Sequence, residues 1–85
     1  MKRILNRKQK FFYHTCSRFR ERFGIEYTGE IKRDIIRQIN TGSAVCLGEN
    51  PSYQGRIQYL ASVKNKKCKV VYSKKYHEIT TVLYV

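Results

Sequence analysis

A histidine and two arginines recur at four-residue intervals near the start of the chain, within YHTCSRFRERFGI at residues 13–25. His14, Arg18 and Arg22 would share one face of a helix, because positions i, i+4 and i+8 lie above one another. Arginine presents a planar fork of donors that fits a phosphate, and histidine exchanges a proton near neutral pH. This face therefore suits phosphate handling, although an ordinary solvent-exposed basic helix would have the same pattern.

A second group of polar and aromatic residues lies at YSKKYHE, residues 72–78. His77 could act as a general acid or base, and Lys74 and Lys75 could neutralise a phosphodiester. Tyr72 could stack on a base or donate its hydroxyl group. A polar hairpin turn with a lysine-coated edge explains the segment equally well, because turns favour polar residues and edge lysines oppose aggregation.

Chemistry on RNA at these residues would proceed without a metal ion. The three cysteines have no C-x-x-C spacing, the acidic residues show no metal-ligand spacing, and no Gly-rich phosphate loop occurs, so we expect no metal and no cofactor. The remaining route is attack of a 2′-hydroxyl on the adjacent phosphorus, with a base, an acid and cations. Thr80 and Thr81 lie nearby, but β-branched residues are common in strands, and only one of the two can face the helical side.

Hydrophobic periodicity predicts the elements that position these residues. Helical spacing predicts a first helix from residue 8 to residue 23, with a buried stripe of Phe12, Cys16, Phe19 and Phe23. His14 lies about 200° from Phe12 at ~100° per residue, so the basic face points away from the stripe. A second helix is expected from an N-cap at Thr28 to the NTG stop at residues 40–42, with isoleucines on its apolar side.

After Gly42 the hydrophobic period changes to two. The expected strands are SAVCLGE, RIQYLASV, CKVVYSK and ITTVLYV, and their short connections imply an antiparallel meander. We therefore predict an α+β fold, in which two N-terminal helices pack on one face of a three- to four-stranded antiparallel sheet. Eighty-five residues suffice for one domain, which would span residues 11–85 behind a basic arm at residues 1–10.

The charge of the chain points to a polyanionic partner. Eighteen Lys and Arg residues against six Asp and Glu residues give a net charge of +12, concentrated at the two ends of the sequence. Nucleic acid is the first partner that such an excess predicts. The expected nucleic-acid contacts are Lys2, Arg3, Arg7, Lys8, Lys10, Lys66, Lys67 and Lys75. No apolar run reaches the length of a signal sequence or a membrane span, so we expect a cytoplasmic protein without a membrane partner.

The segment HTCSRFRERFGI resembles the H-x-x-x-R-x-x-x-R-x-G-I signature of small bacterial and phage domains grouped near the BrnT and RelE toxins. The segment CKVVYSKKYHEITTVLYV is similar to their closing pair of strands, so the resemblance covers residues 12–85. It implies the compact α+β fold of RelE-like and barnase-like ribonucleases. Some members cleave mRNA or tRNA without a metal ion and are held in check by an antitoxin. The resemblance assigns the active site to His14, Arg18, Arg22, Tyr72, Lys74, His77 and Thr81.

The leading hypothesis is a metal-independent endoribonuclease of toxin type, in which a 2′-hydroxyl attacks the adjacent phosphate. His14 and His77 would transfer protons, and the neighbouring arginines and lysines would hold the phosphate. The alternatives are a non-catalytic nucleic-acid-binding protein and a phage-encoded inhibitor of an acidic host protein. The catalytic hypothesis requires His14, Arg18 and residues 72–77 to converge on one cleft.

Overall fold

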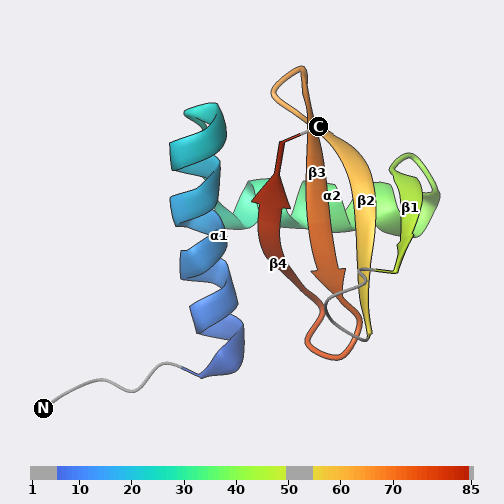
Figure 1. The fold of residues 1–85 in the computed structure, drawn as a ribbon, viewed down its shortest axis with the longest axis horizontal. Helices are drawn as coiled ribbons and strands as arrows, with labels where there is room; N and C mark the ends of the chain where they lie inside the picture. The colour runs from blue at the N-terminus through green and yellow to red at the C-terminus, as the bar shows by residue number, and fades with distance from the viewer. Residues whose placement is uncertain (1–5, 50–54, 85) are drawn as a thin grey trace, which may run out of the picture.

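The computed structural model describes residues 6–49 and 55–84, in which two helices precede a four-stranded antiparallel sheet. The helices are α1 (Arg7–Phe23) and α2 (Gly29–Thr41), and the strands are β1 (Val45–Glu49), β2 (Arg56–Val63), β3 (Lys66–Ser73) and β4 (Glu78–Leu83). The strands lie side by side in chain order, α2 crosses behind one face of the sheet, and α1 runs beside β4 (Figure 1). The predicted α+β fold is confirmed.

A reciprocal cap fixes the start of α1. The Asn6 side chain accepts a hydrogen bond from the Gln9 N–H at 2.8 Å, and the Asn6 N–H donates to Gln9 Oε1 at 3.0 Å. The helix ends at Gly24, whose φ of 63° favours glycine. α1 begins at Arg7, one residue before the start that helical spacing predicted, so residues 7–10 of the predicted basic arm belong to the helix.

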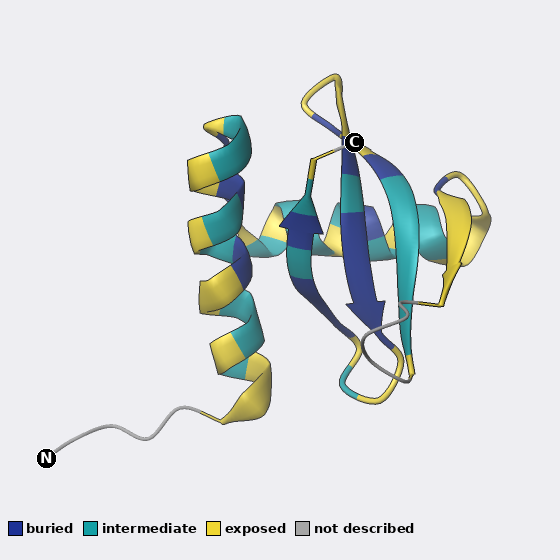
Figure 2. Cartoon of the chain, viewed as in Figure 1, coloured by how far each residue is buried: buried dark blue, intermediate teal, exposed yellow. Residues whose placement is uncertain are grey.

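The core lies between the two helices and one face of the sheet. Its fully buried side chains come from both helices, β3 and β4, and include Phe19, Ile35, Val70, Ile79 and Val82. Figure 2 shows this burial as dark blue bands on β3, β4 and the inner side of α1. The other residues of the predicted stripe on α1, Phe12, Cys16 and Phe23, pack against the core, which confirms the side on which the helix is apolar.

The second face of the sheet is not covered by α2 (Figure 1). Strand β3 pairs with β2 in unbroken register, so its side chains alternate between the two faces. Val70 and Tyr72 belong to the core, and Val71 and Ser73 therefore point to the opposite face. The alternation matters because it decides which of the candidate site residues share a surface.

Polar side chains of α1 cover the edge of β4 that has no neighbouring strand. Thr15 is fully buried, and its Oγ1 lies 2.7 Å from both the Phe11 and the Ile79 carbonyl oxygens. The Arg22 guanidinium donates to the Val82 carbonyl oxygen. These contacts give hydrogen-bond donors to strand carbonyls that would otherwise be unpaired, and they hold α1 against the sheet.

Thr15→Val is expected to lower the free energy of unfolding by about 1–3 kcal/mol. Valine has the shape and helix propensity of threonine but leaves the buried Ile79 carbonyl oxygen without its donor. Urea unfolding followed by circular dichroism measures the change. Ser17→Val, on the exposed side of the same helix, is the control for propensity, and equal effects of the two substitutions would contradict the prediction.

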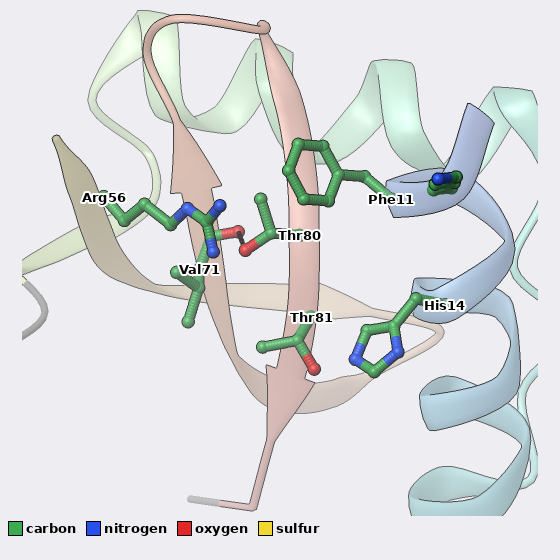
Figure 3. A pocket seen from close by; sticks show the side chains of 7 residues that line it. Phe11, His14, Arg56, Val71, Thr80 and Thr81 are labelled. Carbon is green, nitrogen blue, oxygen red and sulfur yellow. Dashed lines mark hydrogen bonds between the residues drawn. The ribbon is translucent and has the colours of Figure 1, made fainter. Parts of the chain in front are cut away.

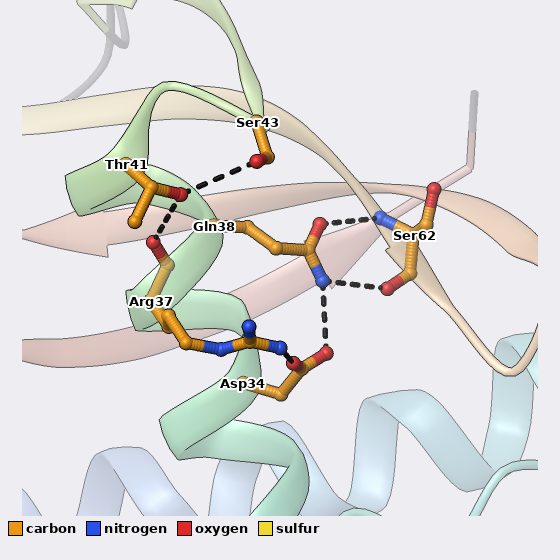
Figure 4. Close-up of polar contacts among 6 residues, drawn as sticks. All are labelled: Asp34, Arg37, Gln38, Thr41, Ser43 and Ser62. Atoms are coloured by element: carbon orange, nitrogen blue, oxygen red, sulfur yellow. Dashed lines mark hydrogen bonds and ion pairs between the residues drawn. The ribbon is translucent and has the colours of Figure 1, made fainter.

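Toward the edge of the sheet opposite to β4, Gln38 joins α2 to β2. Its amide donates to the Ser62 carbonyl oxygen at 2.9 Å and accepts from the Ser62 N–H at 3.0 Å (Figure 4). The pairing of β1 with β2 ends at Leu60, so the Gln38 side chain takes the place of a neighbouring strand at Ser62. Asp34 accepts a further hydrogen bond from Gln38 at 2.9 Å. This clamp fixes α2 against the sheet.

Candidate nucleic-acid interface

A cavity of about 360 Å³ lies between α1 and the uncovered face of the sheet (Figure 3). We call it the seam cavity. Its polar and basic lining comes from Lys10 and His14 of α1, Arg56 of β2 and the two threonines of β4, and its apolar lining comes from Phe11 and Val71. Residues that lie far apart in the sequence thus meet in one concave site.

A β-bulge brings both threonines to this cavity. Val71 pairs with Thr81 and Tyr72 pairs with Ile79, so Thr80 is an extra residue in β4. Thr80 Oγ1 donates to the Val71 carbonyl oxygen at 3.2 Å. The expectation that only one threonine faces the helical side applies to a regular strand, whereas the bulge places both in the lining of the seam cavity.

His14 is the titratable base of the seam cavity, and Figure 3 shows its imidazole directed toward Thr81. Partial burial, followed by the positive charges of Arg18 and Arg22, lowers the pKa of His14 below its ordinary value of 6.5. Glu21 acts in the opposite direction but is the smallest influence. His14 is therefore neutral at pH 7 and can accept a proton.

A second cavity, of about 390 Å³, lies at the β3–β4 turn, and we call it the turn cavity. Four cations line it: Arg7, Arg56, Lys74 and Lys75. Arg56 also lines the seam cavity, so the two cavities adjoin at this residue. No aspartate or glutamate lines either cavity in the described part of the chain. We call their basic side chains the basic tract: Arg7, Lys10, His14, Arg56, Lys74 and Lys75.

Two aromatic rings lie among these cations. Phe11 and Tyr76 are in edge-to-face contact at 5.5 Å between ring centroids. The Arg56 guanidinium lies 5.0 Å from the Phe11 ring, while Arg7 and Lys75 lie 5.8 Å and 5.4 Å from the Tyr76 ring. Such cation–π contacts restrict the cationic side chains to the surroundings of the aromatic pair.

The second histidine does not join His14. His77 lies in the β3–β4 turn, and its Nδ1 is 3.2 Å from the Tyr72 hydroxyl oxygen. Tyr72 is a core residue on the side of the sheet that α2 covers, whereas its neighbour Val71 points into the seam cavity. Burial raises the pKa of Tyr72, so its hydroxyl stays protonated. The structure thus places the Tyr72–His77 pair and His14 on opposite faces of the sheet.

The other predicted catalytic residues lie partly in the two cavities and partly outside them. Lys74 and Thr81 belong to the turn and seam cavities. Arg18 pairs with Glu21 at 2.9 Å on α1, and Arg22 is engaged with β4. The His14–Arg18–Arg22 face therefore reaches the sheet, but only His14 lines the cavity.

The predicted nucleic-acid contacts outside the basic tract are dispersed. Lys8 lines a separate cavity of about 190 Å³, which includes Glu78. Lys66 Nζ donates to the last carbonyl oxygen of α1 at 3.3 Å, and Lys67 is exposed beside it in sequence. Lys2 and Arg3 lie outside the described residues. Of the predicted set, Arg7, Lys10 and Lys75 are in the tract.

Arg56 is the charged site residue that the sequence analysis missed, and Phe11 of the apolar lining was not predicted either. The signal for Arg56 was its position as the first residue of the predicted strand RIQYLASV, where the period of two places it on the face opposite to Ile57. In the structure Arg56 pairs in register with Ser73, beside the predicted Lys74–Lys75 pair. The contribution of Arg56 depends on this strand register, which no local pattern reveals.

Among residues 6–49 and 55–84, no group of three or more His, Cys, Asp or Glu side chains could hold a metal ion. Neither helix of the described chain is long and apolar enough to cross a membrane. Comparisons of the sequence with protein-family models and with curated proteins, and of the structure with solved structures, give no match. The structural part of the case for a function therefore depends on the basic tract.

Proposed function

We propose that the protein binds RNA through the phosphates of its backbone, at the basic tract. The observation that carries this proposal is the convergence of cations from α1, β2 and the β3–β4 turn on two adjoining cavities whose described lining includes no carboxylate. Arginine and lysine supply most phosphate contacts in nucleic-acid complexes, and each neutralised phosphate releases counterions. The net charge of +12 adds long-range attraction to any nucleic acid.

RNA is preferred to DNA for two reasons. The resemblance of residues 12–85 to BrnT and RelE toxins implies an RNA target. In the seam cavity the hydroxyl of the half-buried Thr81 offers a partner for a 2′-hydroxyl, whereas the buried Thr80 hydroxyl already donates to the Val71 carbonyl oxygen. The 2′-hydroxyl is the group by which a protein distinguishes the two nucleic acids.

RNA binding is expected to weaken steeply with salt, with log K falling against log [salt] by about 0.7 for each single-stranded phosphate contacted. Fluorescence anisotropy of a labelled RNA over a salt series measures this slope. Arg56→Gln should lower both the affinity and the slope, because it removes a cation from both cavities. Arg33→Gln, an exposed arginine on α2, is the control. Equal losses of affinity in the two variants would show that binding depends on the net charge and not on the basic tract, and would contradict the proposal.

The two-histidine cleft that the catalytic hypothesis requires is not formed, because Arg18 and the Tyr72–His77 pair lie outside the cavity that His14 lines. Cleavage of the bound RNA by His14 alone is a second candidate function, which the position of His14 beside Lys10 and Arg56 favours. A neutral imidazole next to a phosphate-binding site can take the proton of a 2′-hydroxyl as that oxygen attacks phosphorus. Lys10 and Arg56 of the same cavity would stabilise the negative charge that develops on the phosphate. His77 lies on the other face, so in this scheme water protonates the leaving 5′-oxygen.

A further inference from the structure

We infer that the basic tract holds two consecutive nucleotides of single-stranded RNA, one in each cavity, with Arg56 between their phosphates. This inference rests on the proposed function and names its substrate class. The seam and turn cavities measure about 360 and 390 Å³ and have Arg56 in common. Each is near the lower end of the range of about 300–1,000 Å³ for small-ligand sites, which suits one nucleotide unit.

The shape of the tract favours a single strand over a duplex. The cations of the seam cavity lie in a concavity between α1 and the sheet, with Val71 and the bulged β4 as its floor. A duplex presents its phosphates on a convex rod, and proteins recognise double-stranded RNA across a wide, shallow minor groove. A single strand can splay its nucleotides apart and insert each one separately.

The placement of the aromatic residues supports the same conclusion. Phe11 lines the seam cavity and Tyr76 lines the turn cavity, and the two rings are in contact where the cavities adjoin. Aromatic rings interleaved with cations along a groove are typical of single-strand binding, because bases stack on the rings while the cations follow the backbone. Here the cations lie over the rings, so a base that stacks on Phe11 or Tyr76 would take the place of a cation. Arginine guanidinium planes also stack on unpaired bases.

The test compares a short labelled RNA strand of mixed sequence, free and annealed to its complement, by anisotropy at fixed salt. We expect the free strand to bind about tenfold more tightly, which corresponds to one stacked base. Among unlabelled competitors with a 5′-phosphate, a dinucleotide should compete much better than a mononucleotide. A trinucleotide should add little, because the described tract has two cavities.

Arg56→Gln should reduce the advantage of the dinucleotide over the mononucleotide, whereas the matched Arg33→Gln should retain it. Circular dichroism checks that both variants are folded. Equal binding of free and annealed strands would overturn the single-strand inference and leave the proposed function intact. If the dinucleotide still competed much better than the mononucleotide for the Arg56→Gln variant, the placement of Arg56 between the two phosphates would be overturned. Failure to bind any RNA would overturn the proposed function itself.

Discussion

Lys32→Met is expected to lower the free energy of unfolding by about 3–5 kcal/mol, a large part of the stability of a domain of this size. Lys32 Nζ lies 3.1 Å from Glu78 Oε1, and the Glu78 side chain is only 4% exposed. Glu78 Oε2 is buried and has no hydrogen-bond partner among the described residues. Removing the ammonium group would therefore leave a buried carboxylate with neither of its oxygens compensated.

Thermal and urea unfolding measure this loss, and each kcal/mol corresponds to about 4–8 °C in a domain of 60–100 residues. Arg33→Met removes a neighbouring, exposed cation of the same helix and serves as the control. In the double variant Lys32→Met, Glu78→Met, most of the stability should return, because an apolar pair can replace a buried ion pair at little cost. A single Lys32→Met variant as stable as its control would refute the prediction.

The Lys32–Glu78 pair also bears on the candidate site. Glu78 is the first residue of β4 and follows the turn that carries Lys74, Lys75 and Tyr76. Lys32 ties that end of β4 to α2, while Thr15 and Arg22 tie β4 to α1. Partial loss of RNA affinity in folded Lys32→Met would therefore reflect a displaced turn, since neither partner lines the basic tract.

Local patterns were sufficient to predict the elements of the fold. Apolar residues at helical spacing identified α1 and α2, and the change to a period of two identified the four strands. Helical spacing set the start of α1 at residue 8, whereas the N-x-x-Q capping box of Asn6 and Gln9 sets it at Arg7, inside the basic segment 1–10. Capping chemistry outweighs charge here because it satisfies backbone donors directly.

The assembly of the site was less predictable, since it depends on contacts between distant segments. The alternation of β3 already placed Tyr72 with Cys68 and Val70, and so on the core side, away from a site on the opposite face. By contrast, the proximity of His14 to Arg56 follows from how α1 docks on β4 and how β2 pairs with β3. The bulge at Thr80 is a feature of backbone pairing that Thr-Thr does not specify.

The separation of the two histidines changes what can be expected of catalysis. A ribonuclease with a paired base and acid would show a bell-shaped pH dependence that reports both groups. In the described part of the tract His14 is the sole imidazole, faced by Arg18 and Arg22 of its own helix and by Arg56 across the cavity. Cleavage by this site should therefore depend on one ionisation, with activity in the deprotonated form.

His14→Gln is expected to reduce RNA cleavage by about 10²–10⁴-fold, the usual contribution of a general base, while binding at pH 7 stays close to that of the parent. Binding is retained because His14 is neutral at this pH and contributes no charge. The assay incubates RNA with purified protein in EDTA and analyses the products for 2′,3′-cyclic phosphate ends. Ser17→Gln, on the exposed side of α1, is the control.

The pH dependence of the parent protein gives an independent test, because turnover and affinity should change in opposite directions. Partial burial and then the positive charges of Arg18 and Arg22 lower the pKa of His14, so the drop in cleavage rate on acidification occurs below its ordinary value of 6.5. Over the same interval the protonated imidazole adds a cation to the seam cavity, and RNA affinity should rise. His14→Gln should abolish both changes. Cleavage that persists in His14→Gln with an unaltered pH profile would exclude His14 as the base, whereas affinity that rises on acidification without any cleavage would identify the seam cavity as a binding site alone.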